Sequence, residues 1–144
     1  MHFEDIELGD TLTTAGRTIT EADLVNFAGV SGDFNHLHMD AAEMTDSDFG
    51  ERIAHGALVF SVMTGLLWQS RDADSGLVAL YGVDEVRFRN PTFVGDTVRV
   101  ETEVVDKERR EHPTATGVVR YRAEVVTAEE EKTVLSCVLL ALVK

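Results

Sequence analysis

The chain has 144 residues, a length that fits one domain with a sizeable buried core. It contains 26 acidic and 13 basic residues, which gives a formal net charge of −13 at pH 7. Nucleic acids and anionic membranes bind basic surfaces, so this charge argues against both as partners. Two interpretations of the charge stay open: an ordinary solvated acidic surface, or adaptation to high salt, where dense charge is screened.

Other features of the composition concern the cellular compartment. The sequence has no run of about 18 uncharged apolar residues, so no transmembrane helix is expected. Its opening residues lack the basic and apolar regions of a signal peptide. The single cysteine, Cys137, has no partner for an internal disulfide and lies in the apolar run Val134–Val143, where we expect a small core residue. We therefore expect one domain over residues 1–144, in the cytoplasm.

The start of the chain predicts short extended pieces and then a helix. Gly and Asp residues punctuate residues 3–19 as turns. Thr20 then matches a helix N-cap, with Asp23 three residues later in the pattern of a capping box. Apolar residues follow at helical spacing, so we expect a short helix over residues 21–29 with one buried face.

The longest uncharged stretch, residues 54–68, lies in the middle of the chain. Before it, Asp40 is placed to cap a second short helix over residues 41–48. The uncharged stretch is too long for a typical strand and is apolar on every side, so we expect a helix that is buried all round. Residues 69–76 then form a polar loop.

After residue 76 the pattern changes to the period-two alternation of half-buried strands. Residues 98–103 and 118–125 alternate apolar with polar or charged side chains, and residues 77–90 and 132–143 supply two further strands. One long buried helix followed by several long strands predicts an α+β fold, in which a curved antiparallel sheet wraps around the helix.

A segment rich in turn-forming residues, Ser31–His38, carries an Asp and a His five residues apart. Addition of water to an activated alkene requires one group that removes a proton from water and another that delivers a proton to carbon. A carboxylate and an imidazole on one loop fit these two tasks, so Asp33 and His38 are candidate catalytic residues. The alternative is that Asp33 caps local backbone and His38 lies on the surface.

A second signal, Ala54-His55-Gly56, stands at the start of the uncharged stretch. The first N–H groups of a helix have no internal partner and carry partial positive charge. Because glycine lets a ligand approach the backbone closely, Gly56 is a candidate site for a thioester oxygen that gains charge in the reaction. The alternative is a glycine that simply packs against a strand. His55 is expected to hold the start of the helix by hydrogen bonding.

These two signals together resemble the MaoC-like dehydratases, a family that includes the (R)-specific enoyl-CoA hydratases. The family signature reads roughly Gly-Asp-x-Asn-Pro-x-His, then a variable segment, then Ala-His-Gly before a buried helix. The likeness covers nearly the whole chain, and His36 stands where the family usually has a Pro that stiffens the loop. The matching residues are Gly32, Asp33, Asn35, His38, Ala54, His55 and Gly56, with Arg89-Asn90-Pro91 and Gly95-Asp96-Thr97 later in the chain.

The resemblance implies a hot-dog fold and the reversible hydration of a trans-2-enoyl thioester to its (R)-3-hydroxy form. The substrate would be an acyl-CoA or an acyl-carrier-protein thioester, with neither a cofactor nor a metal. A homodimer or a dimer of dimers is also expected, because an unprotected sheet edge tends to pair with another chain. Asn35 joins the catalytic candidates as a residue that orients the loop or the water; an Asx-turn residue is the alternative.

Several residues are candidates for substrate contacts. An acyl pocket would be lined by Thr64, Leu67 and Trp68, although an apolar helix face is more often core. Near the thioester we expect His55 and Ala57. Arg87 and Arg89 lie two apart, on one face of a strand, and could meet the phosphates of coenzyme A, together with Arg52. The alternative for these arginines is solvated strand charge.

Three other functions compete with the hydratase hypothesis. A hot-dog thioesterase often carries a carboxylate on the central helix, and residues 54–68 contain none. A non-catalytic acyl-binding subunit is disfavoured by the retention of the whole motif. A metal site of the cupin type would use His36, His38 and Glu43, but the sequence offers no suitable second motif and a long mid-chain helix suits a jelly roll badly.

Overall fold

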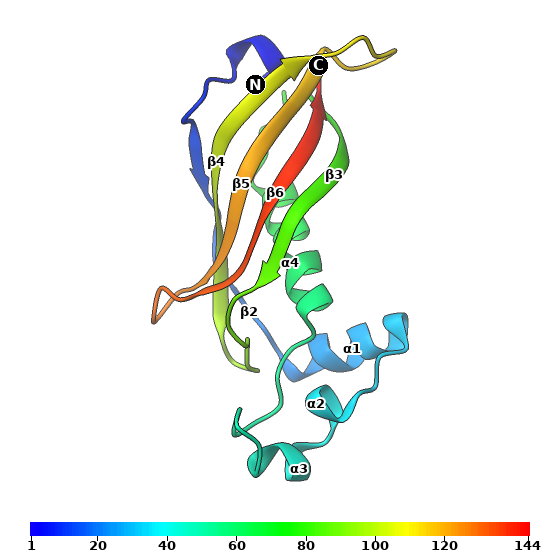
Figure 1. Ribbon diagram of the computed structural model, residues 1–144, viewed down its shortest axis with the longest axis vertical. Helices are drawn as coiled ribbons and strands as arrows, with labels where there is room; N and C mark the ends of the chain where they lie inside the picture. Colours follow the sequence, from blue (N-terminus) through cyan, green and yellow to red (C-terminus); the bar gives the residue numbers. More distant parts are fainter.

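A curved antiparallel sheet and one long helix dominate the computed structural model, which describes residues 1–144 (Figure 1). The sheet has six strands in the order β1-β4-β5-β6-β3, with β2 beside β4. The predicted α+β arrangement is confirmed. The elements in chain order are η1 (Phe3–Asp5), β1 (Thr11–Thr13), β2 (Arg17–Thr18), α1 (Glu21–Ser31), α2 (His36–Met39), α3 (Ala41–Thr45), α4 (Gly56–Gln69), β3 (Leu77–Phe88), β4 (Thr97–Arg109), β5 (Gly117–Thr127) and β6 (Thr133–Val143).

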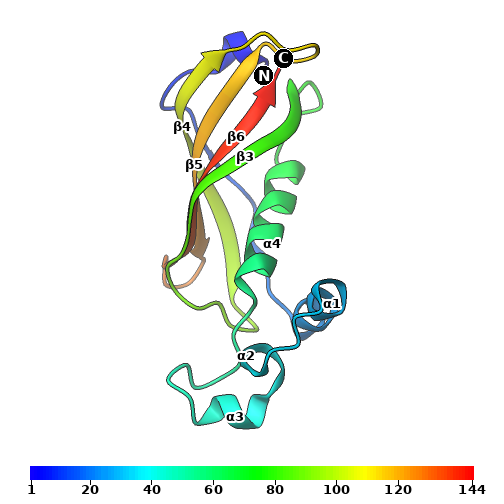
Figure 2. The ribbon, with the colours of Figure 1, turned by 45° about the vertical axis from the view of Figure 1, so that its right-hand side comes forward.

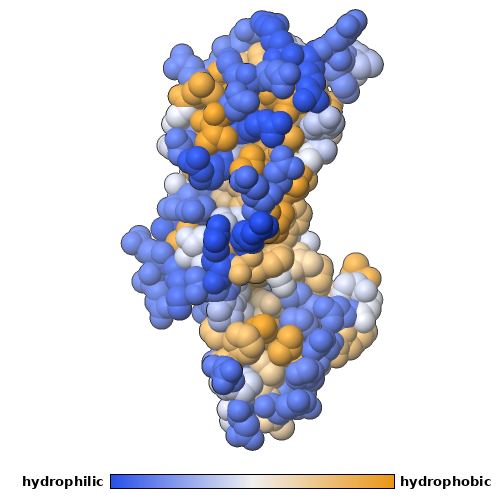
Figure 3. All heavy atoms as spheres, viewed as in Figure 1, coloured by the Kyte–Doolittle hydropathy of each residue, from blue (hydrophilic) through white to orange (hydrophobic).

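The main core lies between α4 and the inner face of the sheet (Figure 2). One side of α4 buries Leu58, Val59, Val62, Met63 and Leu66. The strands contribute side chains from every second position, because alternate residues of a strand point to one face. The outer face of the sheet carries hydrophilic side chains with apolar patches between them (Figure 3).

Cys137 of β6 belongs to this core, as predicted. Only 3% of the residue is exposed, and its Sγ lies 4.0 Å from the sulfur of Met63. Burial raises the pKa of the Cys137 thiol to about 11. The thiol therefore stays protonated at neutral pH and acts as a small apolar side chain.

The expectation of a helix buried on all sides is wrong for α4. Trp68 is 58% exposed, and Ala57, Ser61 and Gly65 of the same helix also lie at the surface. The physical reason is that the sheet covers one side of α4 and no other element of the chain covers the opposite side. An uncharged helix thus presents an uncovered face to the surroundings.

The short helices α1 and α3 begin at their predicted caps, but their lengths differ from the predicted ones. Thr20 and Asp23 form the predicted capping box of α1, but α1 continues through Gly29 to Ser31 and stops at Gly32, whose φ of 78° is left-handed. Asp40 caps α3 as predicted, and α3 is shorter than expected. The four-residue helix α2 was predicted as loop.

Both ends of the chain are bound to the same end of the sheet (Figure 1). Residues 3–5 form a 3₁₀ helix where an extended piece was expected. The amide of Phe3 donates to the carbonyl of Lys144 at 2.6 Å. The amide of Gly76 donates to the carbonyl of Met1 at 3.0 Å. Lys107 adds hydrogen bonds to the carbonyls of Phe3 and Ile6. None of the helices has the length and apolarity that a membrane span requires.

Candidate active site

The candidate catalytic residues lie at the end of the molecule opposite the chain termini (Figures 1 and 2). There α1, α2 and α3 form a small helical layer beyond the sheet, and α4 begins beside it. Asp33 lies between α1 and α2, whereas His38 belongs to α2. The prediction that His38 lies on an irregular loop is therefore wrong in this detail, although the two residues do come together.

The imidazole of His38 faces the carboxylate of Asp33. The Nε2 of His38 lies 3.7 Å from Oδ2 of Asp33, and the side chains are 9% and 51% exposed. The Nδ1–H of His38 donates to the carbonyl of Ile53 at 2.7 Å. Because a carbonyl only accepts, this bond places the proton of the neutral ring on Nδ1 and leaves a lone pair on Nε2, toward Asp33. A separation of 3.7 Å is longer than a direct hydrogen bond.

His55 lies behind this pair and not on the wall of the pocket. The residue is 2% exposed, and its Nε2 donates to the backbone carbonyl of Asp33 at 2.9 Å. Its ring stacks on the ring of His38 with centroids 3.7 Å apart, and Phe27 packs edge-on against it. His55 is the N-cap of α4, but its side chain forms no capping hydrogen bond and instead contacts both candidate catalytic residues. Its Nδ1 is buried and has no hydrogen-bond partner.

Local hydrogen bonds shape the segment that carries Asp33. The hydroxyl oxygen of Ser31 accepts from the amide of Asp33 at 3.1 Å, and Oδ1 of Asp33 accepts from the amide of Asn35 at 3.2 Å. Asn35 in turn is the N-cap of α2, where its side-chain oxygen accepts from the amide of Leu37 at 3.0 Å. Asn35 therefore uses its carbonyl oxygen locally, in line with the Asx-turn alternative.

A pocket of about 560 Å³ opens beside His38 at the start of α4. Gly56 and Ala57 line it, and no side chain caps the helix. The amides of residues 56–58 form no hydrogen bond in the structure, so they remain free donors. The ring of Phe88 lies over Gly56, and a Cβ added there would stand 2.7 Å from it. Packing against the ring of Phe88 therefore favours glycine at this position.

The predicted arginines differ in their surroundings. Arg89 lines the pocket and donates to the hydroxyl of Ser136 at 3.0 Å, and Arg87 donates to the carbonyl of Val86 at 2.8 Å. Neither forms an ion pair. Arg52, in contrast, makes two hydrogen bonds to the carboxylate of Glu21, which lower the pKa of Glu21 and raise that of Arg52. Arg52 is thus already neutralised by a neighbour.

Thr64 and Leu67 do not line the pocket beside His38. They line a second cavity, between the C-terminal half of α4 and the sheet. Thr64 lies eight residues beyond Gly56, which corresponds to about 12 Å along a helix. The structure therefore separates these two predicted acyl contacts from the catalytic pair within one chain.

The histidines and carboxylates do not form the metal site of the cupin hypothesis. His36 and Glu43 are 3.8 Å apart and about half exposed, while the Nδ1 of His38 bonds to the carbonyl of Ile53. A different group, Asp33, His38 and His55, has ligand atoms within 4.8 Å of one another. The fold, with its helix against one sheet, is also not a jelly roll.

Comparisons with known proteins show the family of this chain. Residues 5–127 match the MaoC like domain. The chain is 35% identical over 120 residues to the (R)-specific enoyl-CoA hydratase of Aeromonas caviae, covering 83% of this chain and 86% of that protein. It is 44% identical over 102 residues to protein MaoC of Klebsiella aerogenes, covering 69% of this chain; the matched region spans only 29% of that longer relative.

Solved structures give the same result. The monoamine oxidase regulatory protein of Archaeoglobus has a TM-score of 0.90 at 36% identity, covering 99% of this chain and 94% of that one. The unliganded R-hydratase PhaJ1 of Pseudomonas aeruginosa has a TM-score of 0.79 at 30% identity, covering 99% and 84%. A Mycobacterium tuberculosis protein described as a double hot-dog fold, 22% identical, has a TM-score of 0.83 and covers 99% and 44%.

These findings define a hot-dog protein of the hydratase and dehydratase class, as predicted. The chain belongs to the family of MaoC-like dehydratases.

Proposed function

We propose that this chain catalyses the reversible hydration of a trans-2-enoyl thioester to the (R)-3-hydroxyacyl thioester. The observation that carries the proposal is the Asp33–His38 pair, with a free lone pair on Nε2 of His38 aimed at the carboxylate 3.7 Å away. His38 lines a pocket together with Gly56 and Ala57, whose amides form no hydrogen bond within the chain.

The pair is suited to hold the reacting water. Both Nε2 of His38 and the carboxylate of Asp33 accept hydrogen bonds, and a water molecule between them can donate to each. One member of the pair takes a proton from the water as its oxygen bonds to Cβ of the substrate. The pair then delivers that proton to Cα, so its protonation state is restored and the H and OH add to the same face of the alkene. Which residue performs each transfer stays open.

The start of α4 is suited to hold the thioester oxygen. This oxygen gains negative charge as the enolate forms, and donors fixed toward that charge lower the barrier. The free amides of Gly56 and Ala57 stand at the positive end of the helix dipole. No carboxylate lies on α4, which favours hydration over the thioesterase alternative.

The arginines near the pocket are suited to the polyanionic end of the substrate. Coenzyme A must bind against the field of a chain with net charge −13. Arg87 and Arg89 lack carboxylate partners and lie at the end of β3, and Arg89 lines the pocket. We propose that they contact the phosphates of coenzyme A or of a phosphopantetheine group.

The proposal is tested by an assay that follows the loss of absorbance as the conjugated enoyl-CoA is hydrated. Asp33→Asn and His38→Ala should each lower kcat by roughly 10²–10⁴, the usual contribution of a placed acid or base. The double variant should be little worse than either single one, because the two residues act as a unit.

His36→Gln is the matched control, since it changes an exposed histidine two residues away. Wild-type turnover by both single variants would refute the catalytic assignment. Lack of hydratase activity in the wild-type protein across short and medium enoyl chains would favour the non-catalytic acyl-binding alternative.

A further inference from the structure

Two hydrogen-bond acceptors face one another in the Asp33–His38 pair, and no donor of the protein lies between them. Oδ2 of Asp33 and Nε2 of His38 are 3.7 Å apart, and the carbonyl of Ile53 holds the proton of the neutral imidazole on Nδ1. Lone pairs that face each other repel unless a proton, a water molecule or a cation stands between them. The pair is therefore open to a positive ion as well as to the reacting water.

The separation and chemistry of these two atoms suit a transition-metal ion. Two ligands of a tetrahedral Zn²⁺, each about 2.0–2.1 Å from the ion, stand about 3.4 Å apart. A small rotation of the Asp33 side chain, which is 51% exposed, covers the remaining difference. Imidazole nitrogen favours zinc, copper and nickel over magnesium and calcium. A metal-binding histidine commonly donates its other ring N–H to a backbone carbonyl, and His38 already does so to Ile53.

A second pair of an imidazole and a carboxylate shows why a fixed ring matters. Nε2 of His36 lies 3.8 Å from Oε1 of Glu43, but both side chains are about half exposed. The side chain of His38 is only 9% exposed, and its hydrogen bond to Ile53 and its stacking on His55 fix the ring. Ordering a free side chain costs conformational entropy, so a metal ion should prefer the pair whose imidazole is already fixed.

His55 belongs to the same group of potential ligands but cannot join this pair around one ion. The rings of His38 and His55 are stacked, inclined by 25° with their centroids 3.7 Å apart. The lone pair of a ring nitrogen lies in the plane of its ring, and two nearly parallel stacked rings share no point at coordination distance. The pair therefore supplies two protein ligands and leaves the other positions of the ion to water, which makes binding reversible.

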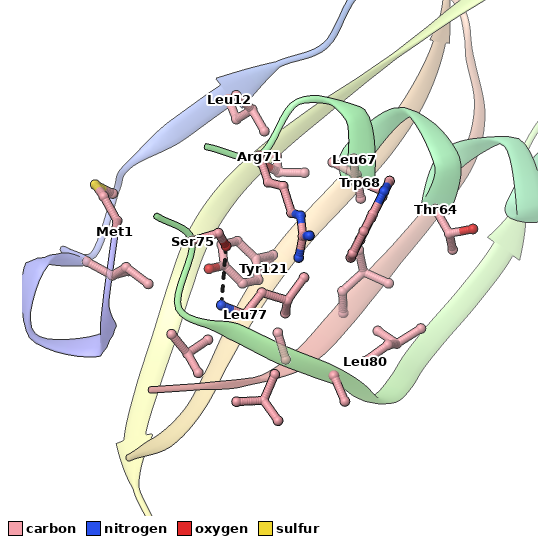
Figure 4. Close-up of a pocket in the computed structure, with 17 residues that line it drawn as sticks. Met1, Leu12, Thr64, Leu67, Trp68, Arg71, Ser75, Leu77, Leu80 and Tyr121 are labelled. Atoms are coloured by element: carbon pink, nitrogen blue, oxygen red, sulfur yellow. Dashed lines mark hydrogen bonds between the residues drawn. The ribbon is translucent and has the colours of Figure 1, made fainter. Parts of the chain in front are cut away.

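The surroundings give a cation access to the Asp33–His38 pair. His38 lines the pocket of about 560 Å³ at the start of α4. The net charge of −13 raises the concentration of cations near the protein surface. The second cavity, beside Trp68 and Arg71, has no histidine, cysteine or carboxylate in its wall (Figure 4). Of these two cavities, only the pocket beside His38 can bind a transition metal through side chains.

We propose that the Asp33–His38 pair binds one Zn²⁺ ion per chain and that this ion inhibits the hydration reaction. An ion between Nε2 of His38 and Oδ2 of Asp33 occupies the lone pairs that would hold the reacting water, so turnover stops until the ion leaves. The binding does not depend on the proposed reaction, whereas the inhibition rests on it.

Calorimetric titration of EDTA-treated, dialysed protein with zinc chloride measures the binding. We expect one saturable site per chain, and no such site for Mg²⁺. Asp33→Asn and His38→Ala should each weaken Zn²⁺ binding about tenfold or more, the scale on which a disturbed metal site loses affinity. His36→Gln, the matched control, should bind Zn²⁺ as the wild type does. Circular dichroism verifies the fold of each variant.

X-ray absorption at the zinc edge gives a second measurement that needs no variant. The spectrum of the wild-type complex should show a single imidazole ligand, because His55 cannot reach the ion. Two imidazole ligands would overturn the proposed arrangement. Absence of saturable Zn²⁺ binding, or equal binding by the wild type, Asp33→Asn and His38→Ala, would overturn the metal site itself.

Hydratase assays separate this proposal from the proposed function. Zn²⁺ should lower the turnover of an enoyl-CoA with an inhibition constant equal to the calorimetric Kd, and EDTA should restore the turnover. Full turnover with the site occupied by Zn²⁺ would overturn the inhibition. A metal-free protein without hydratase activity that still binds Zn²⁺ at the pair would refute the proposed function and support the metal site.

Discussion

His55 contacts both candidate catalytic residues from a buried position. Its Nε2 donates to the carbonyl of Asp33, and its ring stacks on His38. A displacement of about 1 Å in a catalytic group can lower turnover by about 10². We infer that His55 is a positioning residue whose two contacts can be removed separately.

His55→Phe keeps a ring against His38 but leaves the carbonyl of Asp33 without its donor. We expect kcat to fall about 10–100-fold with little change in KM. His55→Gln can place an amide where Nε2 stood, so its loss should be smaller than that of the Phe variant. Steady-state kinetics on an enoyl-CoA and a thermal melt of each protein check this expectation; equal activity of all three proteins would contradict it.

Residue identity and spacing predicted part of this site, and contacts between distant segments supplied the rest. Residue type, spacing and the family resemblance together predicted that Asp33 pairs with His38. The stacking of His55 on His38 did not, because it depends on how α2 meets the start of α4. His36 is the first residue of α2, a position where proline is favoured because it fixes a helical φ. A Pro at this position would preorganise α2, and His36 does not supply that effect.

The proposed oxyanion site is the first turn of α4, where Gly56 meets the ring of Phe88. A side chain at position 56 would act in one of two ways. It would displace this ring, which is 60% exposed at the end of β3 and can move, or it would block a thioester oxygen from the helix amides. A pair of variants separates these effects.

We expect Gly56→Ala to lower kcat by roughly 10² or more, the scale of a lost oxyanion donor. Phe88→Ala removes the ring that a methyl group at position 56 would touch. If the amides hold the oxyanion, the double variant stays as slow as Gly56→Ala. Recovery of activity in the double variant would instead assign Gly56 a packing role.

At the scale of elements, periodicity predicted the long helix and the four long strands. It did not predict that one side of α4 is uncovered, because a uniformly apolar helix has no polar face to mark the exposed side. It also did not predict α2, since four residues are too few for a helical pattern. Only the cap at Asn35 could have indicated this helix.

The whole molecule has two uncovered apolar features, the outer side of α4 and the edge strand β3. Leu80 and Tyr81 of β3 are each about half exposed, as is Trp68 of α4. Exposed apolar area together with an unpaired strand edge favours association with a second copy. We therefore expect a homodimer in solution, to be measured by light scattering at several protein concentrations and in high salt; a monomer throughout would contradict this.

A dimer could build each candidate active site from one chain or from both. Within one chain, Asp33 faces His38, and His38 and Gly56 line the same pocket. If Asp33→Asn and Gly56→Val proteins are mixed under conditions of subunit exchange, we therefore expect no return of activity. Recovered activity would show that each site draws these residues from two chains.

The meeting of both chain ends at one end of the sheet has a consequence for engineering. Phe3 and Lys144 are joined by a backbone hydrogen bond, so a short peptide could connect the two ends without moving either. The chain could then be reopened at a surface hairpin, giving a circular permutant with the same sheet order. For the same reason, a protein fused to either end would stand at the opposite end of the molecule from His38, clear of its pocket.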